Sequence, residues 1–571
     1  MTAKTDPEAA SRLAHELDLS RTTAAVLLHR GLADVETARA FLNPSLKDLP
    51  SPFLLPDMDK AVDRLIQALH RKEQITVYGD YDADGLTSTA LLTDFLLELG
   101  ARVTTYLPHR LAEGYGLNGQ AVELLAAQGT KLIVTVDCGI SDLEAVTKAG
   151  RLGLSVIVTD HHQIPERLPP AWALVNPQLP RSRFPQRKLA GVGVAFFLAG
   201  GLRQALRDRG LLPNGHQPEL APLLGLVAIG TVADVAPLTK VNRILVSQGL
   251  GHLVTPNRPG LAALKEASSL EAHGLLTARD IAFRLAPRLN AAGRMDSAQP
   301  GLDLLLTRDA ETARERAAVL ERFNRERRKL QEEMVREASA MIEDDLEFTK
   351  AVILAKEGWR RGVAGLAAGK LAEAFRRPII LLAVEQGLAR GSARSIKGFN
   401  IYRALDECRE FLVSFGGHEQ AAGLAVSLEQ LPELIQAFQR IAGREIGDEL
   451  LVEALEIDTE AAWPEINGRL ACEMAGLAPF GEGNPEPILA SKGLNVVSAS
   501  TAGGSGAHLR LVLSQNGLSR EMIGYGLGHL LPDLGRRVSI AVRPYTSLYR
   551  GQLNHAWKLV DVKKDMASGR P

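Results

Sequence analysis

Three aspartates alternate with other residues in one short segment of the chain. Asp80, Asp82 and Asp84 lie in VYGDYDADGLTSTALL, after an apolar run that predicts a strand and before residues that predict a helix. Unpaired, these carboxylates would repel one another at the start of the helix, whereas a divalent cation would neutralise them and use their oxygens as ligands. The simpler interpretation is that one of them caps the helix and the others are solvated. The segment alone favours neither interpretation.

Two further apolar runs end in side chains of the same kind. Asp137 follows the first of them, and Asp160, His161 and His162 follow the second. A single histidine in such a place is more often a hydrogen-bonded core residue, but an adjacent pair beside an aspartate is not typical of a core. Bridging carboxylates, a neutral imidazole and open positions for water and phosphate are what a two-metal site needs. Asp234, after an apolar helical run, is a further candidate ligand, although an aspartate there also suits a helix cap.

These side chains converge only if the elements before them form one sheet. Short β-rich apolar runs alternate with amphipathic helices between residues 75 and 159, which predicts a parallel sheet with helices on both faces. In such sheets ligands bind beyond the carboxyl ends of the strands, where the aspartates and histidines lie. The predicted strands are 75–78, 103–106, 132–136 and 154–159, and the predicted helices are 86–99, 119–128 and 142–149.

A highly charged segment divides the chain. Residues 308–346 contain nine basic and eleven acidic residues and no glycine or proline, which predicts one long exposed helix. Its simplest role is to connect two lobes. A coiled-coil dimer helix is the alternative, because Ala317, Leu320 and Phe323 lie on one side.

Patterns on either side of this helix complete the predicted organisation. A second α/β unit is expected from strands at 351–354 and 378–383, and alternating residues at 509–513, 537–543 and 557–562 predict a small antiparallel barrel. The expected domains are a helical preface at 1–70, a catalytic α/β domain at 71–305, a connector helix at 306–347, a smaller α/β domain at 348–455 and the barrel at 456–565.

Composition limits the classes of protein that remain. The 571 residues are 46% hydrophobic and 23% charged, as in ordinary globular proteins, and suffice for several domains. The net charge is -1, so a nucleic acid would have to be held by a local basic channel. The three cysteines lie far apart, which excludes a disulfide framework and a thiolate zinc site. Without a membrane-span or signal-peptide pattern, we expect a cytoplasmic protein with no membrane partner. No GxxxxGK[ST] motif occurs, so no nucleotide cofactor is expected.

Several motifs, in a particular order, carry a resemblance to a known family. DYDADG, VTVDCG and TDHH resemble the DHH phosphoesterase superfamily, and the order of the other motifs is similar to that of the RecJ single-stranded-DNA exonucleases. The other motifs are RGLADVETARAFLNP, LPHR, GTVADVAPL, RLAPRLNAAGR, GSARSIKGFN, FGGHEQAAG and LAPFGEGNPEP. This resemblance covers nearly the whole chain. It implies two α/β lobes, a parallel-sheet DHH domain and a smaller DHHA1 domain, joined by a long helix and followed by an oligonucleotide-binding (OB) barrel.

The resemblance also implies a centre of two divalent ions, Mn²⁺ or Mg²⁺. The implied ligands are Asp82, Asp84, Asp137, His161 and Asp234. Asp137 would bridge the ions, and Asp80 would be a ligand or would orient one. His162 would contact the phosphate, while Asp160 would support His161 and the local backbone.

Residues around the metals are expected to select the substrate. By resemblance, Arg110, Ser392 and Arg394 gather around a terminal 5′-phosphate, because guanidinium groups and a hydroxyl on a glycine-flanked loop suit a dianion. Each arginine alone would more often form a surface ion pair. Further candidates for contact with phosphate or DNA are His109, Arg288, Asn290, Arg294, Ser395 and His418, of which Arg288 and Asn290 are expected to act beside the catalytic groups. In the barrel the candidates are Arg510, Arg543, Tyr545, Tyr549 and Arg550.

The resemblance therefore predicts a 5′-to-3′ exonuclease that hydrolyses single-stranded DNA to mononucleotides in repair and recombination. The alternatives are a DHH phosphodiesterase for short oligonucleotides or cyclic dinucleotides, a pyrophosphatase, and a non-catalytic DHH scaffold. The preface and barrel argue against the small-substrate enzymes, and the intact set of ligands argues against the scaffold. Expected partners are single-stranded DNA, a single-stranded-DNA-binding protein and a helicase, and the chain is expected to be a monomer.

Overall fold

The computed structural model describes residues 6–110, 112–212, 217–270, 274–343, 349–452, 454–549 and 552–565. The chain forms two compact units. The first contains residues 1–289, 301–317 and 455–571, and the second contains residues 290–300 and 318–454.

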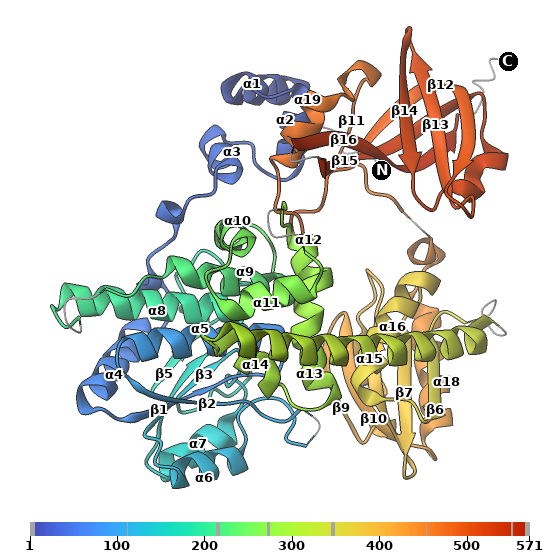
Figure 1. Cartoon of the computed structure of the whole chain (residues 1–571). Helices are drawn as coiled ribbons and strands as arrows, with labels where there is room; N and C mark the ends of the chain where they lie inside the picture. The colour runs from blue at the N-terminus through green and yellow to red at the C-terminus, as the bar shows by residue number, and fades with distance from the viewer. Residues whose placement is uncertain are drawn as a thin grey trace. The chain divides into compact units, whose positions relative to one another are not determined.

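The first unit contains the predicted parallel sheet (Figure 1). Its strand order is β2-β1-β3-β4-β5, and every neighbouring pair is parallel. The strands are β1 (Gln74–Tyr78), β2 (Arg102–Tyr106), β3 (Leu132–Val136), β4 (Ser155–Thr159) and β5 (Ala173–Val175). The four predicted strands are confirmed, and the short fifth strand was not predicted because three residues carry no periodic signal.

Helices cover both faces of this sheet, as predicted (Figure 1). On one face, α6 (Gly119–Ala127) and α7 (Leu143–Arg151) share an apolar core with the strands. On the other lie α4 (Met58–Arg71), α5 (Ala83–Glu98) and α8 (Gly191–Asp208). All residues of α5 from Ala83 to Leu96 are buried, since α8 and α9 (Leu224–Ala233) pack on it.

The rest of this region is helical. The elements are α10 (Lys240–Val254), α11 (Pro259–Ala267), α12 (Ala278–Asp280), the π-helix η5 (Ile281–Leu285), α13 (Ala286–Met295) and α14 (Gln299–Leu306). The charged segment forms one helix, α15 (Ala310–Glu343), which begins in the first unit and continues into the second. Ala317 and Leu320 are fully buried, so this side of α15 is not the exposed seam of a coiled coil.

The C-terminal strands form a curled antiparallel sheet in the order β14-β13-β12-β15-β16. They are β12 (Leu489–Ala502), β13 (His508–Gln515), β14 (Leu518–Gly524), β15 (Arg537–Tyr549) and β16 (Gln552–Lys564), with β11 (Thr459–Glu460) added beside β12. Because β14 also packs against β16, the sheet closes into the predicted OB-like barrel. The helix α19 (Gly468–Ala475) lies against β15 and β16.

The first helices of the chain belong to the core of this barrel. They are α1 (Pro7–Leu17), α2 (Arg21–His29) and α3 (Val35–Leu42), and their buried side chains form one cluster with those of the barrel and α19. Glu473 of α19 accepts hydrogen bonds from the hydroxyls of Ser20 and Thr23, at 2.6 and 2.7 Å. These contacts join residues 7–42 of the expected helical preface to the barrel in one core. Local periodicity predicts such helices but not the partner that covers them.

The second unit contains a mixed sheet in the order β6-β7-β8-β10-β9. Its strands are β6 (Val352–Glu357), β7 (Ile379–Glu385), β8 (Leu388–Arg394), β9 (Ser414–His418) and β10 (Ala421–Ser427), and its helices are α16 (Arg361–Phe375), α17 (Ile401–Glu407) and α18 (Leu431–Glu445). Only β6 and β7 pair in parallel. Ser392 and Arg394, expected on a loop, lie within β8. The adjacent glycine suggested a loop, but Gly391 is needed there because a Cβ atom would collide with the backbone of Leu381.

Among the described residues, no helix is long and apolar enough to cross a membrane. Cys138 and Cys408 are buried, Cys472 is exposed, and all three are free thiols.

Candidate metal centre

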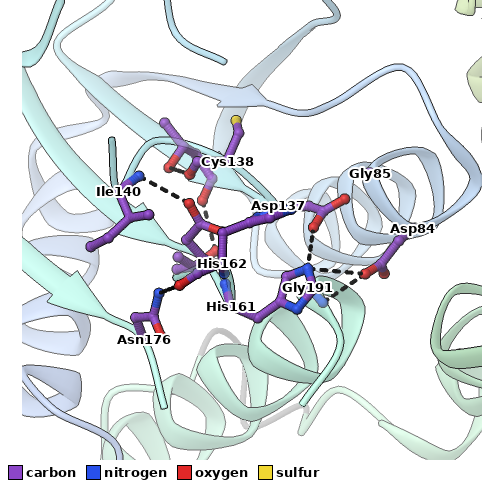
Figure 2. Close-up of polar contacts among 12 residues, drawn as sticks. Asp84, Gly85, Asp137, Cys138, Ile140, His161, His162, Asn176 and Gly191 are labelled. Carbon is purple, nitrogen blue, oxygen red and sulfur yellow. Dashed lines mark hydrogen bonds and ion pairs between the residues drawn. The ribbon is translucent and has the colours of Figure 1, made fainter. Parts of the chain in front are cut away.

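The carboxyl ends of β1, β3 and β4 and the C-terminal end of α9 bring the predicted ligands together. Figure 2 shows three of them, Asp84, Asp137 and His161, pointing toward one another. Asp82 follows β1 and caps α5, where its Oδ1 accepts hydrogen bonds from the amides of Asp84 and Gly85 at 2.9 and 3.1 Å. The capping interpretation is therefore right for Asp82. The same residue also belongs to a cluster of possible metal ligands with Asp80 and Asp137.

Asp84 is held by the start of another helix. Its Oδ2 accepts from the amide of Gly191 at 2.7 Å, and its Oδ1 accepts from the amide of Val192 at 2.8 Å, so the positive end of α8 supports the carboxylate. Gly191 is required for this approach, because a Cβ atom there would lie 2.6 Å from the side chain of Asp137. Gly191 was not predicted, and its only signal in the sequence was its position at the start of an apolar helix.

His161 lies between the other ligands. Its Nε2 is 3.0 Å from Asp137 Oδ1 and 4.0 Å from Asp84 Oδ2, and its Nδ1 is 3.7 Å from Asp234 Oδ2. Asp84, His161 and Asp234 offer ligand atoms within 4.8 Å of one another, and Asp80, Asp82 and Asp137 form a second such group. Asp137 belongs to the second group and also offers a ligand atom within 4.8 Å of His161, which belongs to the first. It therefore connects the two groups, as a ligand that bridges two ions would.

The carboxylates of this cluster resist ionisation in one another's presence. Burial, followed by the charge of Asp234, raises the pKa of Asp84 to about 7. Burial, followed by the charge of Asp82, raises the pKa of Asp234 to about 7. The pKa of Asp137 is raised well above its usual value, first by burial and then by Asp84. Buried carboxylates that repel one another need positive charge to remain ionised.

Unsatisfied oxygen atoms indicate the same need. Asp80 Oδ1 and Asp137 Oδ1 are buried and have no hydrogen-bond partner among the residues that the structure describes. Asp137 also has a φ of 64°, a left-handed conformation that costs a non-glycine residue free energy and is typical of functional sites. The donors are carboxylate oxygens and one imidazole, which suit Mn²⁺ and Mg²⁺. The residues present therefore fit a centre of divalent ions.

His162 is oriented by Asp160 rather than by the cluster. His162 Nδ1 lies 2.7 Å from Asp160 Oδ1, and the other oxygen of Asp160 accepts from the amide of Ile140 at 2.9 Å. Asp160 also accepts from the backbone amides of His161 and His162, so its expected supporting role is confirmed. Burial lowers the pKa of His162, but the hydrogen bond to Asp160 and the negative charges of Asp160, Asp234 and Asp82 together outweigh burial and raise the pKa to about 9.

Tyr115 is a second residue that the sequence analysis missed. Its hydroxyl donates to the carbonyl oxygen of Asp137 at 3.1 Å and lies 3.0 Å from His162 Nδ1. Gly114 and Gly116, both with positive φ, place it in a tight loop. This Gly-Tyr-Gly pattern was the available signal.

Arg110 is the predicted phosphate ligand that the structure places beside the cluster. Its guanidinium lies over the ring of Tyr81, with the centroid 4.9 Å away. Burial raises the pKa of Asp80, and the charge of Arg110 partly offsets this rise. The neighbouring His109 shapes a turn, since its Nδ1 accepts from the amide of Ala112 at 3.2 Å.

The other predicted residues of the first unit make local contacts. Arg288 is buried, and its guanidinium donates to the carbonyls of Arg284 and Ala267 at 2.5 and 3.1 Å. In the barrel, Arg510 pairs with Glu521 at 2.7 Å and Arg543 pairs with Glu486 at 3.3 Å, while Tyr545 is half exposed. The side chain of Tyr549 and the whole of Arg550 lie outside the described residues. Direct contacts of these residues with DNA stay predictions.

The remaining candidates, Asn290, Arg294, Ser392, Arg394, Ser395 and His418, belong to the second unit. Ser392 and Arg394 lie together over Gly365 of α16, where a Cβ atom would be 3.2 Å from the hydroxyl and 2.7 Å from the guanidinium. Arg294 donates to the carbonyl of Gly362 at 3.3 Å, and Ser395 to that of Phe399 at 2.6 Å. His418 is exposed on β9.

Comparison with known families supports this organisation. Residues 74–231 match the DHH family N-terminal domain, residues 348–444 match the DHHA1 domain, and residues 457–561 match the RecJ OB domain. A parallel α/β sheet with this cluster of aspartates and histidines, followed by a DHHA1 domain, defines a DHH-type metal-dependent phosphoesterase.

Individual relatives narrow the class. The chain is 38% identical to the single-stranded-DNA-specific exonuclease RecJ of Bacillus subtilis, over 94% of this chain and 67% of that protein. It is 39% identical to RecJ of Dickeya dadantii, over 91% and 93%. The crystal structure of Thermus thermophilus RecJ in complex with Mn²⁺ matches with a TM-score of 0.84 and 32% identity, over 99% of this chain and 79% of that one. A second structure of that protein contains Mg²⁺ and matches with a TM-score of 0.79. The chain belongs to the RecJ family.

Proposed function

We propose that this chain is a metal-dependent 5′-to-3′ exonuclease that hydrolyses single-stranded DNA to mononucleotides. The observation that carries the proposal is the convergence of three strand ends and the end of α9 on one cluster of five aspartates and a histidine. Its relatives at 38% and 39% identity are named single-stranded-DNA-specific exonucleases. In repair and recombination such an activity would remove a strand from its 5′ end.

The ligands divide into two groups around Asp137. Asp80, Asp82 and Asp137 would hold one divalent ion, and Asp84, His161 and Asp234 would complete the site of the other. Bound ions would supply positive charge that stabilises the charge developing on the phosphate oxygens during hydrolysis. Asp84 keeps its orientation because the amides at the start of α8 hold both of its oxygens.

His162 is assigned to the phosphate of the substrate. Asp160 and Tyr115 fix the orientation of its ring, so little conformational freedom remains to be lost when it meets a substrate oxygen. Arg288 and Asn290 are assigned beside these catalytic groups.

The direction of cleavage is assigned to a terminal phosphate pocket. The charge of Arg110 acts on Asp80 of the cluster, and in the second unit Ser392 and Arg394 lie close to each other on β8. Together they would bind a 5′-phosphate dianion. Contacts with the DNA strand next to this phosphate are assigned to His109, Arg294, Ser395 and His418.

The barrel is assigned as a track for single-stranded DNA. Aromatic residues make up only 5% of the chain, so the barrel would bind mainly the phosphates of the DNA. Its affinity would then depend little on the base sequence. A single-stranded-DNA-binding protein and a helicase are the proposed partners, and the proposed state is a cytoplasmic monomer.

The test is degradation of single- and double-stranded DNA labelled at the 5′ or the 3′ end, with Mn²⁺, Mg²⁺ or EDTA. We expect labelled mononucleotide to be released first from the 5′ end of single strands, and only with a divalent ion. Equal release from both ends, or cleavage limited to di- and trinucleotides, would contradict the proposal. The second outcome would favour a phosphodiesterase for short oligonucleotides.

A further inference from the structure

The backbone turns sharply directly after the metal ligand Asp234. The amide of Ala236 donates to the carbonyl of Thr231 at 3.2 Å, which closes the end of α9 around Val235. Val235 has a φ of 56°, a conformation that β-branched residues rarely adopt. Its side chain is 66% exposed, so its own packing does not hold it there. The residues that follow must therefore stabilise the turn that directs Asp234.

Those residues are in contact with the motif LAPFGEGNPEP of the C-terminal domain. Leu238 is buried, and its amide donates to the carbonyl of Glu482 at 2.7 Å. A Cβ atom on Gly483, whose φ is 69°, would lie 3.0 Å from Cβ of Pro237. One on Gly481 would lie 2.8 Å from Cδ1 of Leu238. The two glycines of the motif thus allow close approach to the loop after Asp234.

We call residues 477–484 the clasp, and internal hydrogen bonds keep its shape. Gly481 and Asn484 exchange two backbone hydrogen bonds, at 2.9 and 3.1 Å. The Asn484 side chain is buried and donates to the carbonyls of Leu477 and Pro479 at 2.9 and 2.7 Å. The clasp can therefore transmit a displacement instead of absorbing it.

A buried arginine fixes the clasp to the helices around it. Arg243 of α10 donates to the carbonyls of Leu477 and Ala478 at 2.9 and 2.7 Å, and to that of Phe41 at 2.8 Å. Its guanidinium also stacks on the Phe41 ring at 3.7 Å. Removal of these acceptors would leave a buried charged group unsatisfied, which is costly.

The loop after Asp234 has one further support. Asn242, fully buried on α10, donates to the carbonyls of Pro237 and Lys188 at 3.1 and 2.7 Å. If this support were sufficient, the contact with the clasp would serve only to attach the barrel. The two possibilities differ in what a small displacement of the clasp does to metal binding.

We propose that the clasp positions Asp234, so that the affinity of the catalytic centre for divalent ions depends on a segment of the C-terminal domain. The inference rests on the proposed function, because it takes Asp234 to be a metal ligand. It extends that function by making the motif LAPFGEGNPEP a support of the metal centre as well as the entry to the barrel.

The test is Mn²⁺ binding to the full chain, measured by electron paramagnetic resonance of free Mn²⁺, for Gly483→Ala and Gly517→Ala. Gly517 also has a positive φ, 81°, but no atom within 4 Å of an added Cβ, so its variant carries the same backbone penalty without the collision. We expect Gly483→Ala to lower the affinity for Mn²⁺ by about 10-fold or more, as loss of a residue that supports a metal ligand commonly does, and Gly517→Ala to bind like the wild type.

Equal Mn²⁺ affinities of the two variants would overturn the proposal. If Gly483→Ala does not fold, Gly481→Ala decides the question, since its φ is not positive and its added methyl meets the flexible end of Leu238. Unchanged affinity in Gly481→Ala would then overturn it. A wild-type chain that neither binds Mn²⁺ nor hydrolyses DNA would instead contradict the proposed function, and that result depends on no variant.

Discussion

His161 Nε2 lies 3.0 Å from Asp137 Oδ1, although the two residues follow different strands. The parallel register of β3 and β4 explains this proximity, because it pairs Val136 with Thr159 at the ends of the strands. The residues that follow the pair therefore leave the sheet side by side. A shift of one residue in this register would turn alternate side chains to the opposite face and separate these two side chains.

We expect Asp137→Asn to lower the rate of hydrolysis by at least about 10³-fold, because a neutral amide cannot bridge two cations. The affinity for single-stranded DNA should remain within a few-fold of the wild type, since the substitution keeps the volume of the side chain. Steady-state rates with Mn²⁺ and binding isotherms in EDTA measure the two effects. Asp208→Asn, at an exposed carboxylate on α8, is the matched control and should behave like the wild type. Wild-type turnover in Asp137→Asn would remove Asp137 from the metal centre.

Stabilisation by metal should increase with pH. The folded pKa of Asp84 and of Asp234, about 7, lies above the usual 3.8, so the stability that each contributes is fully present below about pH 4 and is lost as pH rises toward 7. The loss in EDTA should approach ~1.4 kcal/mol per pH unit for each group. Mn²⁺ neutralises the carboxylates and should restore this stability.

The measurement is the difference between the Tm in Mn²⁺ and the Tm in EDTA, from pH 5 to pH 8. Groups remote from the metal affect both Tm values equally, so their effects cancel in this difference. We expect the difference to grow up to about pH 7, to level off above it, and to grow less in Asp234→Asn. A difference that does not depend on pH would show that these carboxylates are not the groups that the metal neutralises.

A 5′-phosphate should accelerate degradation if Arg394 binds it. The wild type should degrade a 5′-phosphorylated strand faster than a 5′-hydroxyl strand, by about 10- to 100-fold for one charge-assisted contact worth about 1.5–3 kcal/mol. Arg394→Ala should remove this preference. Arg390→Ala, at an exposed guanidinium on the same strand β8, should keep it. Equal rates of the wild type on both substrates would exclude the phosphate pocket.

How much the sequence predicts depends on the range of the interactions involved. Strand ends are local features, so Asp137 and His161 could be placed together from apolar runs and the rule for parallel sheets. Tyr115 and Gly191 could not, because each acts through a contact with a residue far away in the sequence, and such a contact leaves no periodic pattern. The assignment of Ser392 to a loop was wrong because Gly391 serves close strand packing instead of a turn. The partner of the N-terminal helices was missed for the same reason as Tyr115, since packing between distant segments leaves no local pattern.

The shared core of the N-terminal helices and the barrel changes what a truncation should do. The sequence alone predicts that removal of residues after 455 leaves the two α/β lobes folded. In the structure, Leu13 of α1 and Val26 and Leu27 of α2 are buried in one cluster with barrel residues, so truncation at residue 455 would expose these side chains. Complete exposure of each costs about 1.5–3 kcal/mol.

We therefore expect residues 46–455 to be more stable and less prone to aggregation than residues 1–455, although the second fragment is longer. Removal of the N-terminal helices together with the barrel takes away both sides of the shared core. No apolar surface of that core is then left exposed to water. It also removes all three carbonyl acceptors of Arg243 together, so the guanidinium meets water instead of an incomplete set of partners. Thermal unfolding and light scattering of the two fragments at equal concentration measure the difference. A higher Tm for residues 1–455 would mean that the N-terminal helices find a second partner in the α/β domains, and the shared core would not be what stabilises them.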